Sequence, residues 1–474
     1  MSAHHAHGGE TAPAVGPRFC ERLCPLGIPV HELCALHDAG KHTEAMNQLL
    51  ARSPFPGTVA RLCSRPCGRG CPLSAQGHAP AVRELERFLS DHVRPPRLSP
   101  LPSSGKRVAV IGAGPAGLSA ARFAALFGHS VDIYERAPLA GGIPRLAIPA
   151  FRLPRHVVDR ETATALEGDV RLFTNVTVGR DIMLAELLER YDACVLAVGL
   201  WHERMLTMPG MELFRPGFDW LCRMAMEPES LEGRDVAILG GSDVAFDCAR
   251  TAVRLKARSV QLICLESEAS LLSAREDAAQ AKAEGVRLCA SVIGRELKQD
   301  GGRLRLHAER VRSFHFNEHC QLCVDVEENS ACAFEADMFF CSNGLVFEED
   351  VLNGVDVERN SRGRVLTDEG GRTSVPHLFA AGDMAAGPTR AASAIAFGRR
   401  AAESVHLFLT GQPAPQLFPE KADGSASSGP AQLLPFRGGR PPVDVPFCEA
   451  GEGLSPERAA QEAALCLSCP DCIR

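Results

Sequence analysis

The sequence of 474 residues predicts an α/β protein in which two nested parallel-sheet units follow an all-helical, cysteine-rich domain. Three observations lead to this prediction. Residues 18–95 place helical apolar spacing between closely set cysteines, as in VHELCALHDAGKHTEAMNQLLA and AVRELERFLSDH. Residues 106 to about 410 alternate short β-branched runs with helical stretches. Two glycine-rich strand–turn–helix units stand inside that second stretch.

Shifts in composition set the expected boundaries. We expect a disordered polar tail over residues 1–17, a helical domain over 18–95, and a linker rich in Pro and Ser before residue 106. The first α/β unit is expected in two parts, 106–230 and 336–411, with the second unit, 231–335, inserted between them. Residues 412–446 are interpreted as a flexible tether, and 447–474 as a cysteine-bearing helix that returns to the first domain.

The overall composition excludes several classes of protein. A net charge of −7 gives no general basic surface suited to nucleic acid. No apolar run is long enough to span a membrane, and the start of the chain has no signal-peptide pattern, so we expect a cytoplasmic location. Nineteen cysteines in a large chain without an export signal favour metal binding over disulfides.

The first glycine-rich unit reads KRVAVIGAGPAGLSAARFAALFGHSVDIYER. Its strand Val108–Ile111 runs into Gly112, which makes the tight turn, and Gly114, which lets the backbone approach a pyrophosphate on the helix N-terminus. Gly117 allows close packing of helix on strand, and Glu135, 23 residues after the first glycine, can accept hydrogen bonds from a ribose. The predicted dinucleotide site comprises Gly112, Gly114, Pro115, Ala116, Gly117 and Glu135.

The second unit reads RDVAILGGSDVAFDCARTAVRLKARSVQLICLES. Its second fingerprint position is Ser242, whose side chain crowds the approach of a pyrophosphate. The next strand ends at Glu266, whose carboxylate suits a free ribose 2′-hydroxyl and repels a 2′-phosphate. A working site should therefore prefer NADH to NADPH, whereas the alternative is a degenerate site that keeps only the fold. The residues expected here are Gly240, Gly241, Ser242, Asp243, Val244, Ala245 and Glu266.

Two dinucleotide units in one chain, the second inserted in the first, indicate a flavin reductase. The first unit would bind FAD, and the second would bring a nicotinamide to the flavin face. The segment VPHLFAAGDMAAGPTRAASAIAFGRRAA fits this reading, because Asp383 lies after a strand and before a helix and can hold the ribityl or pyrophosphate part of FAD. Other residues expected to bind the cofactors are Arg136, Gly142, Arg152, Gly199, Gly344, Gly382 and Ala394.

Cysteines gather at both ends of the chain. Cys63, Cys67 and Cys71 are four residues apart, and the tail ends with Cys466, Cys469 and Cys472, which are three residues apart. Close thiolates of this kind belong to an iron–sulfur or a zinc site. Zinc sites usually use CxxC pairs with a distant second pair, so the Pro-flanked trio and the flavin context favour iron–sulfur. A third site is the alternative for a further group in strand-like segments, Cys320, Cys323, Cys332 and Cys341.

At several linked segments the chain resembles the small (β) subunit of bacterial glutamate synthase and the N-terminal region of dihydropyrimidine dehydrogenase. These segments are FCERLCPLGIPV, NQLLARSPFPGTVARLCSRPCGRGCPL, GAGPAGLSAARFAA, GGIPRLAIPAFRLPRHVVDRE, YDACVLAVGLWHERMLTMPG, GGSDVAFDCART and LFAAGDMAAGPTRAASAIAFGRRAA. The resemblance implies an NAD(P)H oxidoreductase with nested Rossmann-like domains for FAD and NAD(P), behind an all-α domain with two [4Fe–4S] clusters. Members that use NADPH carry paired arginines where this chain has Leu265 and Glu266, which agrees with a preference for NADH.

The resemblance also implies the cluster ligands. They are Cys24, Cys63, Cys67 and Glu86 for one cluster, and Cys20, Cys71, Cys466 and Cys469 for the other. The family has Gln or Glu at the position of Glu86, and the alternative is a solvated helix residue. The tail segment EAALCLSC resembles a first helix that the N-terminus lacks, so we expect the tail to fold back. Cys472 either replaces Cys20, or the three tail cysteines belong to a cluster shared with a partner.

Together these observations predict an electron-input subunit. NADH would be oxidised at FAD, and electrons would pass singly through two clusters to a partner redox protein or larger catalytic subunit, in a hetero-oligomer. We expect no acid–base catalytic residue, no nucleic acid and no membrane span. The alternatives are a non-catalytic relay with a dead nicotinamide site, and a bifurcating subunit whose flavin splits an electron pair between two acceptors.

Overall fold

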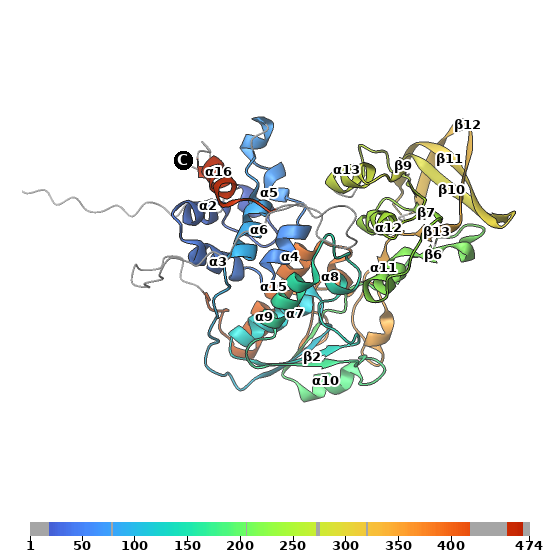
Figure 1. Cartoon of the computed structure of the whole chain (residues 1–474). Coiled ribbons are helices and arrows are strands. Elements are labelled where there is room, and N and C mark those ends of the chain that lie inside the picture. The colour runs from blue at the N-terminus through green and yellow to red at the C-terminus, as the bar shows by residue number, and fades with distance from the viewer. Residues whose placement is uncertain are drawn as a thin grey trace, which may run out of the picture.

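The computed structural model describes residues 19–76, 79–204, 206–271, 275–318, 321–417 and 453–467 (Figure 1). The expected tail over 1–17, most of the expected tether over 412–446, and Cys320, Cys469 and Cys472 lie outside the described residues. In the part of the chain that is described, no helix has both the length and the apolar character needed to cross a membrane.

The first domain is helical. Its elements are α1 (Phe19–Leu23), α2 (Val30–Asp38), α3 (His42–Leu50), α4 (Pro56–Leu62), α5 (Pro66–Arg69), the 3₁₀ turn η1 (Pro72–Gln76) and α6 (Val82–His92). The apolar spacing of the sequence explains α6, because Leu85, Phe88 and Leu89 fall on one face and are buried. Leu33 of α2 and Met46 of α3 fill the same core.

The first α/β unit has a parallel sheet of order β15–β4–β1–β2–β3. Its strands are β1 (Arg107–Ile111), β2 (Ser130–Glu135), β3 (Val170–Thr174), β4 (Ala193–Leu196) and β15 (Leu378–Ala380). Figure 1 shows one face covered by α7 (Pro115–Leu126), α9 (Arg155–Ala165) and α15 (Ala391–Thr410), and the other by α10 (Leu184–Arg190). β1 lies between β2 and β4, so its carboxyl end is the switch point at which such sheets bind ligands.

The second unit has its own parallel sheet, of order β6–β13–β7–β8–β9. Its strands are β6 (Arg215–Pro216), β7 (Asp235–Leu239), β8 (Ser259–Ile263), β9 (Arg287–Cys289) and β13 (Met338–Cys341), and its helices are α11 (Gly217–Met226), α12 (Asp243–Arg254) and α13 (Arg275–Ala283). The sheet therefore takes in elements outside the expected bounds of 231 and 335. β8 ends at Ile263, because the chain turns three residues before Glu266.

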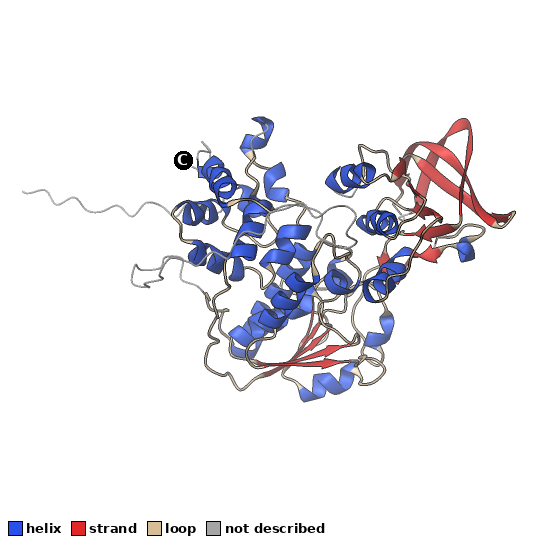
Figure 2. Cartoon of the chain, viewed as in Figure 1, coloured by secondary structure: helices blue, strands red, loops and turns tan. Residues whose placement is uncertain are grey.

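A long antiparallel sheet extends the second unit and was not expected from the sequence. Its strands are β10 (Val292–Asp300), β11 (Arg303–Phe316) and β12 (Leu322–Ala336). Figure 2 shows it at the end of the molecule away from the helical domain. Short connecting elements complete the two units: α8 (Ile143–Leu146), β5 (His202–Glu203), η2 (Met211–Leu213), β14 (Leu345–Val346), η3 (Glu349–Leu352) and α14 (Asp383–Ala386).

The tail helix α16 (Pro456–Leu467) packs on α2 and α6, so the two ends of the chain lie side by side (Figure 1). Ser455 begins the helix as expected, because its hydroxyl accepts a hydrogen bond from the Arg458 N–H at 3.3 Å. Because the second unit is inserted between β4 and β15 of the first, behind an all-α domain, the predicted fold class is confirmed.

Candidate functional site

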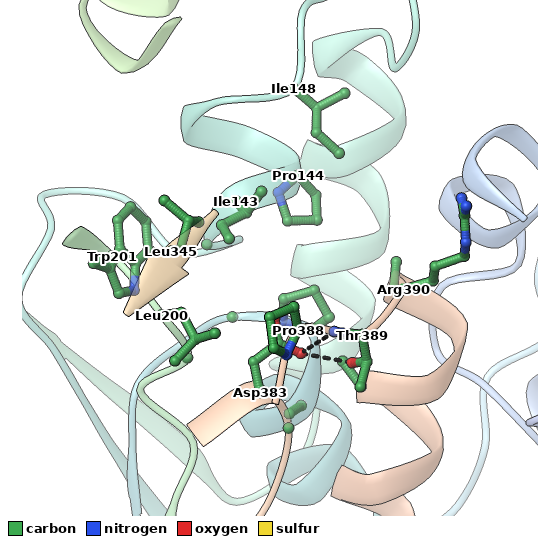
Figure 3. Close-up of a pocket in the computed structure, with 18 of the residues that line it drawn as sticks. Ile143, Pro144, Ile148, Leu200, Trp201, Leu345, Asp383, Pro388, Thr389 and Arg390 are labelled. Carbon is green, nitrogen blue, oxygen red and sulfur yellow. Dashed lines mark hydrogen bonds between the residues drawn. The ribbon is translucent and has the colours of Figure 1, made fainter. Parts of the chain in front are cut away.

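A cavity of about 480 Å³ opens at the carboxyl end of β1. All three domains contribute to its wall, with Leu62 from the helical domain and Val244 from the second α/β unit. Figure 3 shows apolar side chains such as Ile143 and Trp201 on one side and Asp383 on the other. The volume falls within the range of about 300–1,000 Å³ that is usual for cofactor pockets.

Most of the residues that the sequence assigns to cofactors line this cavity. Those in its wall are Gly112, Gly114, Pro115, Ala116, Glu135, Gly142, Arg152, Gly199, Ser242, Asp243, Val244, Gly344, Gly382, Asp383 and Ala394. The remainder are not part of its lining: Gly117, Arg136, Gly240, Gly241, Ala245 and Glu266.

The first glycine loop has the backbone that a dinucleotide requires. Gly112 has a φ of 101°, and a Cβ there would lie 2.6 Å from the Ala197 carbonyl oxygen. A Cβ on Gly114 would meet nothing nearer than the Gly142 Cα at 3.9 Å, so the space over this loop is open. The Glu135 carboxylate accepts backbone hydrogen bonds, from the Ala113 N–H at 2.6 Å among others, and burial raises its pKa. The loop fits a flavin dinucleotide, with room for a pyrophosphate and a carboxylate beside it for a ribose.

Asp383 is held at the opposite side of the cavity. Thr389 donates to it twice, from its backbone N–H at 3.1 Å and from its hydroxyl at 2.6 Å (Figure 3). Burial raises the pKa of Asp383 to about 6, while the hydrogen bonds from Thr389 oppose that rise. The preceding Gly382 has a φ of 79°, so the chain turns sharply to point this carboxyl into the cavity wall.

The second glycine loop differs from the expected crowding at Ser242. The Ser242 hydroxyl caps α12 by accepting from the Ala245 N–H at 3.4 Å, and it donates to the Ser342 carbonyl oxygen at 3.3 Å. Glu266 lies against the loop, because a Cβ on Gly241 would collide with its carboxylate. The geometry therefore puts an acidic group next to the Gly241 backbone, as the NADH hypothesis requires.

Ion pairs cross the cleft between the two α/β units. Arg152 Nη1 lies 2.7 Å and 2.8 Å from the two carboxylate oxygens of Asp247 in α12, and Arg152 Nη2 lies 3.7 Å from Asp277 in α13. Arg390 pairs with Asp243 at 3.3 Å. The cofactor cavity is therefore bordered by cross-domain charges in which the first unit provides the cations.

The helical domain also contacts the second unit through charges. Glu276 of α13 pairs with Arg65 and, at 3.2 Å, with Arg83. Arg83 also donates to the Cys63 carbonyl oxygen at 3.2 Å. We call this contact the Glu276 bridge, and it ties the cysteine-bearing loop after α4 to the nicotinamide unit.

The structure brings Cys24, Cys63, Cys67 and Glu86 together. Burial and the nearby Glu86 carboxylate raise the pKa of Cys63 to about 11 and of Cys67 to about 12. Burial is also the main cause that raises the pKa of Cys24, again with a contribution from Glu86. Burial raises the pKa of Glu86 itself to about 8, so the solvated alternative for this residue does not fit its 7% exposure. A cationic cluster core would offset this desolvated set of donors.

The tail helix brings Cys466 to the other predicted ligand group. Burial, Glu21 and the nearby Cys466 raise the pKa of Cys20. Glu462 in α16 accepts a hydrogen bond from the Ala81 N–H at 3.0 Å, which fixes the helix against the start of α6. Cys71 is partly exposed and follows α5, whereas Cys469 and Cys472 lie outside the described residues.

Among the described residues, no group of three or more His, Cys, Asp or Glu is arranged closely enough to hold a metal ion. The inner thiols gather more loosely than the ligands of a single zinc, which stand about 2.3 Å from their ion. A cluster of several irons holds its thiolates farther apart than one ion does, and the donor chemistry of thiolates with one carboxylate suits such a cluster.

Two protein-family models match the chain. One, described as pyridine nucleotide-disulphide oxidoreductase, matches residues 106–398, and the other, described as dihydropyrimidine dehydrogenase domain II, 4Fe-4S cluster, matches residues 15–97. The glutamate synthase [NADPH] small chain of Mycobacterium tuberculosis is 32% identical over 437 residues, which is 84% of this chain and 87% of that one. The chain belongs to the glutamate synthase small-chain family. Its membership makes it an NAD(P)H-dependent FAD oxidoreductase with a 4Fe–4S domain.

Other relatives of this small-chain family member differ in length. The Escherichia coli K12 glutamate synthase [NADPH] small chain is 29% identical, with 83% of this chain and 89% of that chain matched. The NADP(+)-dependent formate dehydrogenase subunit beta of Moorella thermoacetica is 31% identical, but the match spans only 60% of that longer protein and 82% of this chain. The structure of Mycobacterium tuberculosis FprA in complex with NADPH has a TM-score of 0.53 at 19% identity, over 65% of this chain and 84% of that one, which shows a shared fold.

Several residues of the site were not predicted from the family pattern or the glycine fingerprints. Trp201 lines the cavity, with its Nε1–H donating to the Val198 carbonyl oxygen at 2.8 Å, and Thr389 orients Asp383. Glu276 was also missed, because its arginine partners lie about two hundred residues away in the sequence. Only the packing of the domains brings such residues together.

Proposed function

We propose that the chain is an electron-input subunit that oxidises NADH at FAD and passes the electrons through two [4Fe–4S] clusters to a partner redox protein. The observation that carries this proposal is a direct adjacency. Leu62 lines the cofactor cavity, and the next residue is Cys63, a predicted ligand of the inner cluster. An electron that leaves the cavity would therefore reach the inner ligand group within one residue of the chain.

The chain's own residues supply binding and position. FAD, when bound, supplies the chemistry of hydride acceptance and single-electron release. Glu135 would hold its ribose, and Asp383, oriented by Thr389, would hold its ribityl or pyrophosphate part. Glu266 beside Gly241 would accept hydrogen bonds from the free ribose hydroxyls of NADH.

The two predicted ligand groups then lead away from the cavity. Cys24, Cys63, Cys67 and Glu86 would hold the inner cluster, and Cys20, Cys71 and Cys466 would hold the outer cluster with a tail cysteine. The names of the relatives describe small and beta subunits, which supports assembly of this chain with a larger partner.

Anaerobic titration with NADH and, separately, NADPH tests the proposal through flavin and cluster absorbance. We expect NADH to bleach both, and NADPH to act far more weakly. Glu266→Gln should narrow the ratio of the two affinities by about tenfold, equivalent to about 1.4 kcal/mol, because it removes the charge that repels a 2′-phosphate. No bleaching by either dinucleotide, with FAD and iron present, would contradict the proposal.

A second candidate is a relay subunit whose nicotinamide site does not work. Ser242 favours it, because its hydroxyl already occupies the Ala245 N–H at the start of α12, where a pyrophosphate would dock. In that case Ser242→Gly should create NADH-driven bleaching that the natural protein lacks. Under the main proposal, the natural protein bleaches before any substitution is made.

A further inference from the structure

The helical domain is covered by other parts of the chain on most sides. α16 packs on α2 and α6, the first α/β unit packs on α4 through α9 and α15, and the Glu276 bridge joins the loop after α4 to the second unit. The described residues leave open one face, where α1 packs against α5. We call this the α1–α5 face and define it by its exposed residues, Arg22, Leu23, Pro25, Arg69 and Pro72.

This face has the composition of a small docking site. Leu23 is 38% exposed, and Pro25 and Pro72 are exposed with it, so apolar surface stands between two exposed arginines, Arg22 and Arg69. Electron-transfer proteins meet through small interfaces, below about 1,200 Å² in total, so a patch of this size is sufficient for a transient encounter.

The charge of the surrounding domain points to the kind of partner. Residues 19–97 contain ten Lys or Arg and seven Asp or Glu, although the whole chain has a net charge of −7. A locally positive face on a negative molecule attracts an acidic surface and orients it during the encounter, since complementary charges raise association rates.

The predicted cluster ligands lie directly behind this face. Arg22 and Leu23 stand between Cys20 and Cys24, and Arg69 stands between Cys67 and Cys71. Each exposed arginine is therefore two residues from a ligand of the predicted outer cluster. A partner bound here would be close to that cluster and on the opposite side of it from the covered surfaces.

We propose that the α1–α5 face docks an acidic protein that carries a one-electron redox centre. This inference rests on the proposed function, because it uses the outer cluster as the point of electron exit. One NADH would reduce two carriers, giving NAD⁺, one proton and two reduced carriers. The two arginines supply the steering charge, and the exposed leucine and prolines supply the dry centre of the contact.

The test compares two haem proteins of opposite charge as acceptors for the complete FAD- and iron-loaded chain. Acidic cytochrome b5 and basic cytochrome c both accept single electrons, and menadione, a neutral quinone, reports NADH oxidation that needs no docking. We expect cytochrome b5 reduction to be faster than cytochrome c reduction and to fall steeply with added salt. Preference for cytochrome c, or rates independent of salt, would overturn the proposal.

Charge variants locate the effect. The double variant Arg22→Glu with Arg69→Glu should lower the ratio of cytochrome b5 to menadione rates by about tenfold or more, because both steering charges reverse. A control with the same change in net charge is Arg180→Glu with Arg312→Glu, which lie in the first unit and on β11 and should keep the ratio. An equal fall in both double variants would overturn the docking face.

The outcomes also separate this inference from the proposed function. If NADH fails to reduce menadione, the proposed function fails and the docking inference fails with it. If menadione reduction proceeds while cytochrome b5 shows neither preference nor salt dependence, only the docking face is rejected. Should the double glutamate variant lose iron, the neutral pair Arg22→Gln with Arg69→Gln and the salt series on the natural protein decide the question.

Discussion

His129 is a buried histidine far from the cofactor cavity. It is 1% exposed, its Nε2 lies 3.0 Å from His406 Nδ1 in α15, and its Nδ1 lies 2.7 Å from the Ser104 hydroxyl. Burial lowers the pKa of His129 to about 4, with His406 adding to the shift and Asp192 opposing it. The pair is therefore neutral in the folded protein and joins the first sheet to its covering helix.

Protonation should make this pair a source of acid sensitivity. Above pH 6.5 both folded and unfolded chains are neutral here, but between pH 6.5 and about 4 the unfolded chain binds a proton that the folded chain does not. The free energy of unfolding should fall by up to about 1.4 kcal/mol per pH unit for one such proton. We expect His129→Gln to show a shallower fall in urea unfolding series from pH 7.5 to 5.

The control for this prediction is His315→Gln on β11, where the histidine is exposed. That variant should keep the acid slope of the natural protein. If His129→Gln also keeps the natural slope, the buried pair does not titrate as described.

The sequence predicted single residues well where the requirement is local. Gly112 and Glu135 belong to one strand–turn–helix–strand segment, so their spacing alone states their place. Glu161 and Trp201 could not be found in this way. Glu161 satisfies donors about a hundred residues earlier in the chain, and Trp201 lines the cavity through the packing of two domains.

At the scale of elements, α4 depends on an acid from another domain. Its Ncap residue provides no side-chain cap, and Glu161 of α9 instead accepts from the Gly57 N–H at 2.5 Å, the Thr58 N–H at 2.9 Å and the Thr58 hydroxyl at 2.6 Å. This capping fixes the helix that ends at Leu62 and Cys63.

We expect Glu161→Ala to destabilise the protein by about 2–4 kcal/mol, because it leaves several buried donors without an acceptor. Limited proteolysis should then cut the helical domain more readily, and iron should be lost faster during gel filtration. Glu403→Ala, which removes a partly exposed pair with Arg399 in α15, is the control and should cost less than about 0.5 kcal/mol. Similar losses in both variants would show that the capping role is absent.

The tail helix α16 yields a second prediction at this scale. Because Cys466 is buried beside Cys20, Cys466→Ser should remove a ligand of the outer cluster and leave the inner group intact. Iron should fall from about eight per chain towards four, and one of two cluster signals should disappear from the electron paramagnetic resonance spectrum. Cys332→Ser on β12 is the control, and retention of all iron in Cys466→Ser would contradict the assignment.

Helices with a clear apolar period were predictable, as α6 and α16 show, because one buried face repeats in the sequence. The antiparallel strands β10–β12 were not predictable in the same way. Their side chains alternate between polar and apolar without a long buried run, and the parallel units on either side of them suggested a uniform α/β pattern.

At the scale of the whole molecule, charges of opposite sign join the domains. The second unit contributes Asp243, Asp247, Glu276 and Asp277, and the other two domains contribute Arg65, Arg83, Arg152 and Arg390. The sequence could not show this complementarity, because each pair joins distant segments. The arrangement lets α13 contact the cysteine-bearing loop and the flavin unit through neighbouring residues.

The Glu276 bridge should control how firmly the nicotinamide unit is held against the helical domain. Glu276→Gln removes the charge shared by Arg65 and Arg83, so local opening should become easier by up to about 1 kcal/mol, or about fivefold in amide exchange. Hydrogen–deuterium exchange should quicken in residues 61–70 and 275–283 and stay unchanged in β11.

Glu268→Gln is the matched control for this bridge, because Glu268 pairs with Lys282 of the same helix α13 at 2.6 Å without crossing to another domain. We expect it to leave exchange in residues 61–70 at the natural rate. If both variants changed that loop equally, the effect would come from α13 itself, and the bridge would not couple the two domains. A response confined to Glu276→Gln would show that the cysteine loop and the nicotinamide unit move as one body.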